Sequence, residues 1–180
     1  MSTRPLIVSF VGPSGVGKTT VIEQLIALIR ARGLTVGTVK HTPHGHEVDK
    51  IGSDSWRHRQ AGADAVLLAG AAGAVIFLAP AHGNGDTGAH HSVAESEGVN
   101  HVTELVAAHL GHVDVVLAEG FAALHDRIIL VHRTAIPQKE PRTPANVWLT
   151  ISDEPKGSRE VGFDDLSAVA LLIVQQASGD

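Results

Sequence analysis

The stretch from Gly12 to Thr19 has the residue types and spacing of a phosphate-binding loop. It reads Gly-Pro-Ser-Gly-Val-Gly-Lys-Thr and fits the pattern G-x-x-x-x-G-K-[ST] at every fixed position. The glycines matter because a Cβ would block close approach of the phosphates or the required φ angles. In such a P-loop the lysine reaches the β- and γ-phosphates and the following hydroxyl holds Mg²⁺. The residues expected to bind the nucleotide are Gly12, Pro13, Ser14, Gly15, Val16, Gly17, Lys18, Thr19 and Thr20.

Two acidic residues are candidates to complete this site. Glu119 follows an apolar run at 113–118, where an acidic residue is expected to order Mg²⁺ or its waters, although a surface carboxylate is the simpler alternative. Asp49 lies in a polar loop after the second expected strand, a usual place for a switch residue. We therefore assign Lys18, Asp49 and Glu119 as catalytic residues, and Thr19 and Glu119 as metal ligands. We expect Lys18 to lie on the solvent side of the empty loop.

The sequence gives a weaker indication of how a nucleotide base is recognised. There is no Asn-Lys-x-Asp stretch, the usual guanine reader of GTPases. Asp153 follows a late strand and could accept hydrogen bonds from the N1 and N2 donors of guanine. Arg57 and Arg59 could contact phosphate or an acidic pterin, or form a charged helix face.

Histidines are grouped in two segments, but neither group has a spacing that fixes a metal geometry. We interpret them as polar loop residues rather than a transition-metal site. The two groups are His41, His44 and His46 with Glu47 and Asp49, and His82, His90 and His91.

The elements that position these residues alternate between strand and helix. An apolar strand at 6–11 precedes the loop, and a helix follows from Thr20 to Arg32 with Gly33 as its end. This order predicts an α/β fold of the P-loop NTPase type, with three α/β/α layers and a mainly parallel sheet. Further strands are expected at 34–40, 65–69, 75–79, 113–118, 128–131 and 147–151, and further helices at 56–60, 93–110 and 164–176.

Length and composition favour one nucleotide-binding domain over residues 1–180, with a flexible loop rich in glycine and histidine at about 80–92. The formal charge of −5 argues against a nucleic-acid or anionic-membrane surface. The absence of cysteine agrees with a reducing cytoplasm. The uncharged run at 65–81 is interpreted as two short buried strands rather than a membrane span, because Gly70, Gly73 and Pro80 interrupt it.

At residues 40–63 the sequence resembles the molybdopterin-guanine dinucleotide biosynthesis adaptor family, MobB. The similar segments are Val39-Lys40-His41-Thr42-Pro43-His44, the run from Val48 to Ala63, the P-loop, and Leu117-Ala118-Glu119-Gly120-Phe121. The resemblance implies a cytoplasmic homodimer that binds GTP and Mg²⁺ and hydrolyses GTP weakly at most. It also implies assistance to the guanylyltransferase that joins GMP to molybdopterin, with a molybdopterin-type ligand as a further candidate. It carries Gly15, Gly17, Lys18 and Thr19 over to phosphate and Mg²⁺, Glu119 to the metal, and Asp49 to a second nucleotide-facing loop.

The sequence departs from the family in three places. Ala122 stands where a lysine usually follows Glu-Gly-Phe, residues 125–133 match only loosely, and the segment 80–92 is unusually rich in glycine and histidine. These departures concern partner or pterin contacts more than nucleotide binding.

Two other functions fit the same loop. A small-molecule kinase would need an acceptor site and an arginine-bearing lid, for which Arg57, Arg59, Arg127, Arg133 and Arg142 are available. A metal-delivery GTPase would use the histidine segments, although no cysteine is present to supply a thiolate.

Overall fold

A computed structural model describes residues 4–40, 50–63, 65–70, 73–78, 95–121, 126–136, 144 and 146–179. The chain divides into two compact units, one of Met1–His41 with Ser92–Asp180 and one of Thr42–His91. The single domain expected from the sequence stays a prediction.

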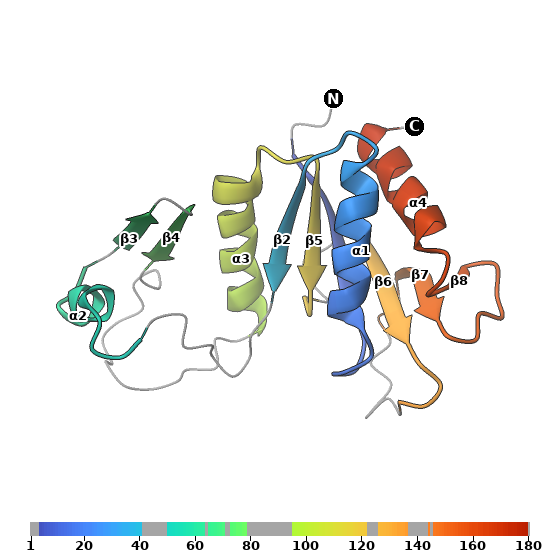
Figure 1. Ribbon diagram of the computed structural model, residues 1–180, viewed down its shortest axis with the longest axis horizontal. Coiled ribbons are helices and arrows are strands. Elements are labelled where there is room, and N and C mark those ends of the chain that lie inside the picture. Colours follow the sequence, from blue (N-terminus) through green and yellow to red (C-terminus); the bar gives the residue numbers. More distant parts are fainter. Residues whose placement is uncertain are drawn as a thin grey trace. The chain divides into compact units, whose positions relative to one another are not determined.

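The larger unit contains a six-stranded parallel sheet, as far as the described residues extend. The strand order is β2-β5-β1-β6-β7-β8. The strands are β1 (Leu6–Val11), β2 (Val36–Lys40), β5 (Val115–Glu119), β6 (Arg127–His132), β7 (Val147–Ser152) and β8 (Glu160–Gly162). The helices are α1 (Lys18–Arg30), α3 (Glu95–Leu110) and α4 (Leu166–Ser178). This arrangement, visible in Figure 1, confirms the predicted α/β class with its mainly parallel sheet.

Alternating strand residues place the helices on the two faces of this sheet. On one face Val8 and Leu117 pack with Leu25 of α1 and Ile173 of α4 in a buried apolar cluster. The neighbouring residues Ile7 and Val116 point the other way and pack with Val106 of α3. Successive side chains of a strand lie on opposite faces, so α1 and α4 cover one face and α3 the other. The expected three layers therefore follow from apolar residues at both phases of β1 and β5.

The carboxyl ends of the central strands meet at one edge, where α1 begins (Figure 1). Glu119 at the end of β5 is level with Lys40 of β2 and with Phe10 of β1. Ligands of open parallel sheets bind at this edge, beyond the strand ends. The P-loop residues, Glu119 and Asp153 all lie at or next to this edge.

The smaller unit contains α2 (Asp54–Gln60) and an antiparallel pair, β3 (Ala65–Gly70) and β4 (Gly73–Leu78). Ser53 begins α2, where its Oγ accepts a hydrogen bond from Trp56 N at 3.1 Å. The two expected strands are present, but they are not buried throughout. Val66 is buried, whereas Leu67 is 64% exposed and its cross-strand neighbour Ile76 is 46% exposed.

Other differences concern element ends and one strand. The short strand β8 was not predicted, because three residues between turns carry no readable alternation. The last helix begins two residues later than expected, with Asp165 as its N-cap. The segment expected to be flexible at 80–92 lies outside the described residues. Of the helices that the structure describes, none is long and apolar enough to cross a membrane.

Candidate functional site

The P-loop passes so close to strand β6 that only glycine fits at its start. Gly12 has φ +144°, and a Cβ there would lie 2.3 Å from the carbonyl oxygen of Val131. Val16 is fully buried beneath the loop and belongs to the apolar cluster of α1 and α4. The loop is thus anchored on both sides, which holds its backbone N–H groups in place for an anion.

The N-terminus of α1 is left without a side-chain cap. Its N-cap residue is Gly17, with φ 102°, and neither a side-chain hydrogen bond nor an acidic residue occupies the first turn. Helix α4 is different, because the Asp165 carboxylate accepts a hydrogen bond from Ala168 N. The first-turn N–H groups of α1 and the helix dipole therefore form a site for an anion that no acidic side chain of that turn competes for.

Lys18 points back into the loop rather than to solvent. Its ammonium group donates to the carbonyl oxygens of Gly12 at 2.9 Å and Pro13 at 2.7 Å. Burial lowers the pKa of Lys18, a nearby Glu119 carboxylate raises it, and Lys40 lowers it further. The expectation of a solvent-side lysine was wrong, because two loop carbonyls take the place of water as acceptors.

Thr19 and Glu119 lie together at the start of α1 and the end of β5. The Thr19 hydroxyl is 3.1 and 3.0 Å from the two carboxylate oxygens of Glu119. The Lys40 ammonium group lies 3.5 Å from the same carboxylate, whose side chain is only 16% exposed. A hydroxyl and a carboxylate beside a phosphate site are hard oxygen donors, so they fit Mg²⁺, which is bound by one or two carboxylates plus phosphate oxygens. Within the described part of the chain, no group of three or more histidine, cysteine or acidic residues could hold another metal.

Asp153 follows β7 and is tied to the end of β6. Its carboxylate accepts hydrogen bonds from Thr134 N at 2.9 and 3.2 Å and from Thr134 Oγ1 at 3.1 Å. These bonds, with a contribution from the charge of Arg133, hold the pKa of Asp153 below its ordinary value. An ionised carboxylate can accept about four hydrogen bonds, so the contact with Thr134 leaves acceptor capacity at this strand end.

Asp49 and both histidine groups lie outside the described residues. Arg57 lies on α2 in the smaller unit, where it is exposed and its guanidinium is 3.9 Å from the Asp54 carboxylate. Its charged-face interpretation fits this pairing.

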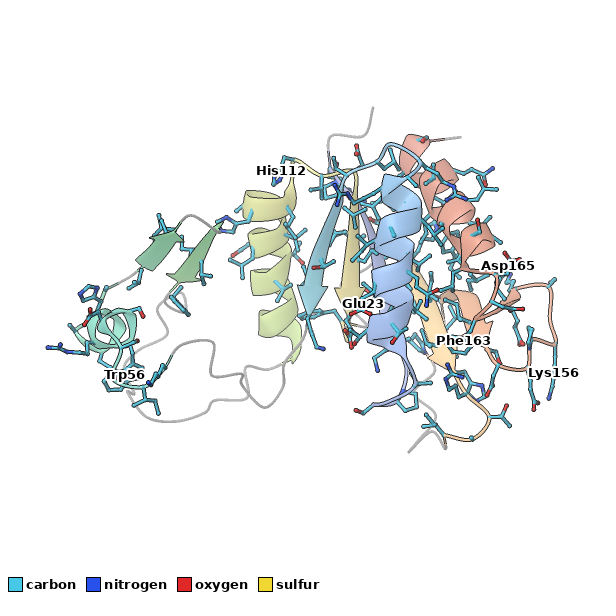
Figure 2. All side chains as sticks on the ribbon, in the orientation of Figure 1. Glu23, Trp56, His112, Lys156, Phe163 and Asp165 are labelled. Carbon is cyan, nitrogen blue, oxygen red and sulfur yellow. The ribbon has the colours of Figure 1, made fainter. Side chains whose placement is uncertain are left out.

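Two side chains beside the P-loop were not assigned from the sequence. Arg133 Nε donates to the Val16 carbonyl at 3.1 Å, and its guanidinium lies 3.9 Å from the ring centre of Phe163. Figure 2 shows Phe163 close to the end of β6. Arg133 follows an expected strand, so the strand-end argument used for Glu119 applied to it as well. Phe163 follows the unpredicted β8 and had no such signal.

Comparisons with known proteins agree on one family. The family described as molybdopterin guanine dinucleotide synthesis protein B, MobB, matches residues 7–153. Similar curated proteins are molybdopterin-guanine dinucleotide biosynthesis adapter proteins. The Haemophilus influenzae protein is 44% identical over 69 residues, covering 38% of this chain and 39% of the relative. The Escherichia coli protein is 44% identical over 63 residues, covering 35% and 36%. These matches span about two fifths of the relatives' length.

Solved structures are similar over nearly the whole chain. A crystal structure of molybdopterin-guanine biosynthesis protein B superposes with a TM-score of 0.66 at 25% identity, covering 96% of this chain and 99% of that one. The MobB homologue of Bacillus stearothermophilus gives 0.62 at 21% identity, covering 97% and 99%, and supports the fold alone. Because the family match covers well over half of the sequence, the chain belongs to the MobB family.

Proposed function

We propose that this chain is a GTP-binding adaptor in molybdenum cofactor maturation, which assists a guanylyltransferase in converting molybdopterin to its guanine dinucleotide. The observation that carries the nucleotide part is the contact of Thr19 with Glu119 beside an uncapped helix N-terminus. The pathway and partner follow the names of the similar adapter proteins. The proposed location is the cytoplasm.

The P-loop residues would bind the triphosphate by exchanging internal contacts for phosphate contacts. Lys18 would leave the carbonyls of Gly12 and Pro13 for the β- and γ-phosphate oxygens, which are stronger acceptors because they are charged. Thr19 and Glu119 would hold Mg²⁺, which when bound neutralises developing charge on the phosphates. We propose slow turnover at most, with Asp49 contributing from outside the described residues.

Asp153 is proposed to read guanine. It stands at the end of β7, two strands from the P-loop strand β1 in the sheet order. Its lowered pKa, caused first by the Thr134 N–H and further by Arg133, keeps it ionised and therefore an acceptor. Guanine presents two donors, N1–H and N2–H, where adenine presents an acceptor at N1.

Nucleotide titration of purified protein tests this proposal. Wild type is expected to bind GTP with Mg²⁺ in preference to ATP, measured by calorimetry. Lys18→Met should weaken GTP binding by about 100-fold or more, because two charge-assisted hydrogen bonds of about 1.5–3 kcal/mol each are lost. Lys156→Met is the matched control, since Lys156 is 79% exposed and pairs only with Glu154 among the described ion pairs. Equal binding of GTP by the Lys18 variant would refute the assignment of the P-loop.

The adaptor role needs a second readout. Addition of wild-type protein to a molybdopterin guanylyltransferase should increase formation of the guanine dinucleotide, and Lys18→Met should remove that increase. A wild-type protein that binds GTP but neither associates with the guanylyltransferase nor changes its product yield would contradict the adaptor role while leaving GTP binding intact.

We also propose a homodimer that uses the β3–β4 pair. Leu67 and Ile76 are directly opposite in register, and both are large, apolar and exposed. An exposed apolar pair on a two-stranded sheet favours association, since such pairs are marginally stable alone. Ile76→Asp is expected to convert a dimer to a monomer in light scattering at micromolar concentration. Leu171→Asp, an exposed apolar position on α4, should leave the mass unchanged. A monomeric wild-type protein would contradict the proposal.

A further inference from the structure

A planar cation stacked on an aromatic ring borders the P-loop of this structure. Arg133 Cζ lies 3.9 Å from the ring centre of Phe163, and Arg133 Nε donates to the Val16 carbonyl. A Cβ on Gly17 would lie 3.8 Å from an Arg133 η nitrogen and 3.9 Å from the Phe163 ring. The pair is therefore next to Gly17, the residue that precedes α1.

Strand order places this pair on the opposite side of the P-loop from the Glu119 carboxylate and its partner Lys40. Glu119 and Lys40 come from β5 and β2, which lie on one side of β1. Arg133 and Phe163 follow β6 and β8, which lie on the other side. If the outer phosphate of a triphosphate lies near Glu119, its nucleoside lies on the side of the P-loop away from Glu119. On that side, the ends of β6, β7 and β8 are available to contact the nucleoside.

The chemistry of the pair suits a nucleobase. Guanidinium planes and aromatic rings both stack on bases, and a guanidinium gives up its hydration more readily than an ammonium. The Arg133 guanidinium lies over the Phe163 ring, and a base can stack on the face of the guanidinium that is turned away from the ring.

We propose that Arg133, supported by Phe163, is the platform on which the base of the bound nucleotide stacks. This inference rests on the proposed nucleotide binding and adds the residues that hold the base. Phe163 acts through Arg133 and is a positioning residue. Asp153, which accepts hydrogen bonds from Thr134, the residue after Arg133, is still the residue proposed to read guanine.

Comparison of GTP with inorganic tripolyphosphate tests the platform, because tripolyphosphate fills a phosphate site and has no base. Phe163→Leu keeps an apolar side chain and removes the ring, and Arg133→Lys keeps the charge and removes the plane. Each should weaken GTP binding by roughly 5- to 140-fold, the range expected for loss of base stacking, and change tripolyphosphate binding by less than about twofold. Trp148→Leu is the matched control. Arg127 Cζ lies 5.8 Å from the centre of the Trp148 ring, and Arg127 is at the opposite end of β6 from Arg133. GTP binding should therefore not change in this variant.

The outcomes separate the platform from other roles. Equal losses for GTP and tripolyphosphate would show that the pair only supports the P-loop, and unchanged GTP binding would show that it has no role in binding. Either result overturns the proposal. Melting temperatures confirm that each variant is folded, and the two variants provide independent tests. If wild type binds a different nucleotide instead of GTP, the guanine assignment fails. The losses of affinity for that nucleotide and for tripolyphosphate, compared in the same variants, then test the platform proposal. If no nucleotide binds better than tripolyphosphate, both proposals fail.

Discussion

Replacement of Glu119 by glutamine is expected to raise the affinity for GTP without Mg²⁺ and to reduce the gain in affinity when Mg²⁺ is added. In the free protein this carboxylate accepts from Thr19 and pairs with Lys40, and it is largely shielded from solvent. Without Mg²⁺, its negative charge opposes the incoming phosphates. The Gln variant should therefore bind GTP more tightly in the absence of metal, and should gain less than wild type when metal is added.

The magnitude follows from Coulomb's law at this site. A phosphate charge about 6 Å from the carboxylate, at an effective dielectric constant of about 20, is opposed by about 3 kcal/mol. Pairing with Lys40 and partial solvent exposure reduce this to about 1–2 kcal/mol, which corresponds to roughly 5- to 30-fold in metal-free affinity. The enhancement by Mg²⁺ should shrink by at least the same factor, because one metal ligand is also lost.

Calorimetric titration of GTP in EDTA and in millimolar Mg²⁺ measures both quantities. Asp114→Asn is the matched control, because Asp114 lies directly before β5 at its opposite end and its side chain bonds only to Thr35 among the described contacts. A Gln variant with the same ratio of the two affinities as wild type would refute the role of Glu119 and the charge argument together.

Two further predictions concern the fold around the site. Gly12→Ala should lower the free energy of unfolding by about 2–5 kcal/mol in urea denaturation, because the added Cβ clashes with the Val131 carbonyl and the φ angle is strained for alanine. Gly33→Ala is the control: its φ is +88° but nothing lies within 4 Å of the added Cβ, so it should lose only about 1 kcal/mol. Similar losses would show that β6 yields to the added Cβ. Hydrogen bonds from the Thr35 side chain and backbone lower the pKa of Asp114 below 3.8, so its stabilising contribution exists above that pH and is lost as the pH falls through the folded-state pKa. The stability difference between wild type and Asp114→Asn should therefore shrink in acid, and a difference independent of pH would contradict it.

The proximity of the P-loop and Glu119 could be predicted from the sequence because each part has a local signature. The P-loop is contiguous, and its lysine and hydroxyl are fixed by spacing. Glu119 was found because an apolar run ends there and parallel strands end at one edge. The structure places Thr19 and Glu119 in contact although 100 residues separate them. Only the direction of Lys18 was missed, because nothing in the sequence shows which acceptors an empty loop offers.

Burial of the β3–β4 pair was mispredicted for a different reason. We expected the apolar side chains of both strands to be buried. An apolar sequence indicates that burial would stabilise the strands. It does not indicate whether the same unit, another part of the chain or another molecule buries them. The exposed Leu67 and Ile76 therefore carry information that the sequence pattern could not supply.

The two sides of the P-loop also differ in what they can say about function. Lys18, Thr19 and Glu119 would serve a kinase, a switch or an adaptor equally well, because each of these functions requires residues that bind phosphate and Mg²⁺. Base selection requires side chains beyond the phosphates, and we propose those that follow β6, β7 and β8. Arg133, Asp153 and Phe163 each follow a different strand and are far apart in the sequence, so no short sequence motif contains them. The residues that best separate the candidate functions are thus those that only the folded chain brings together.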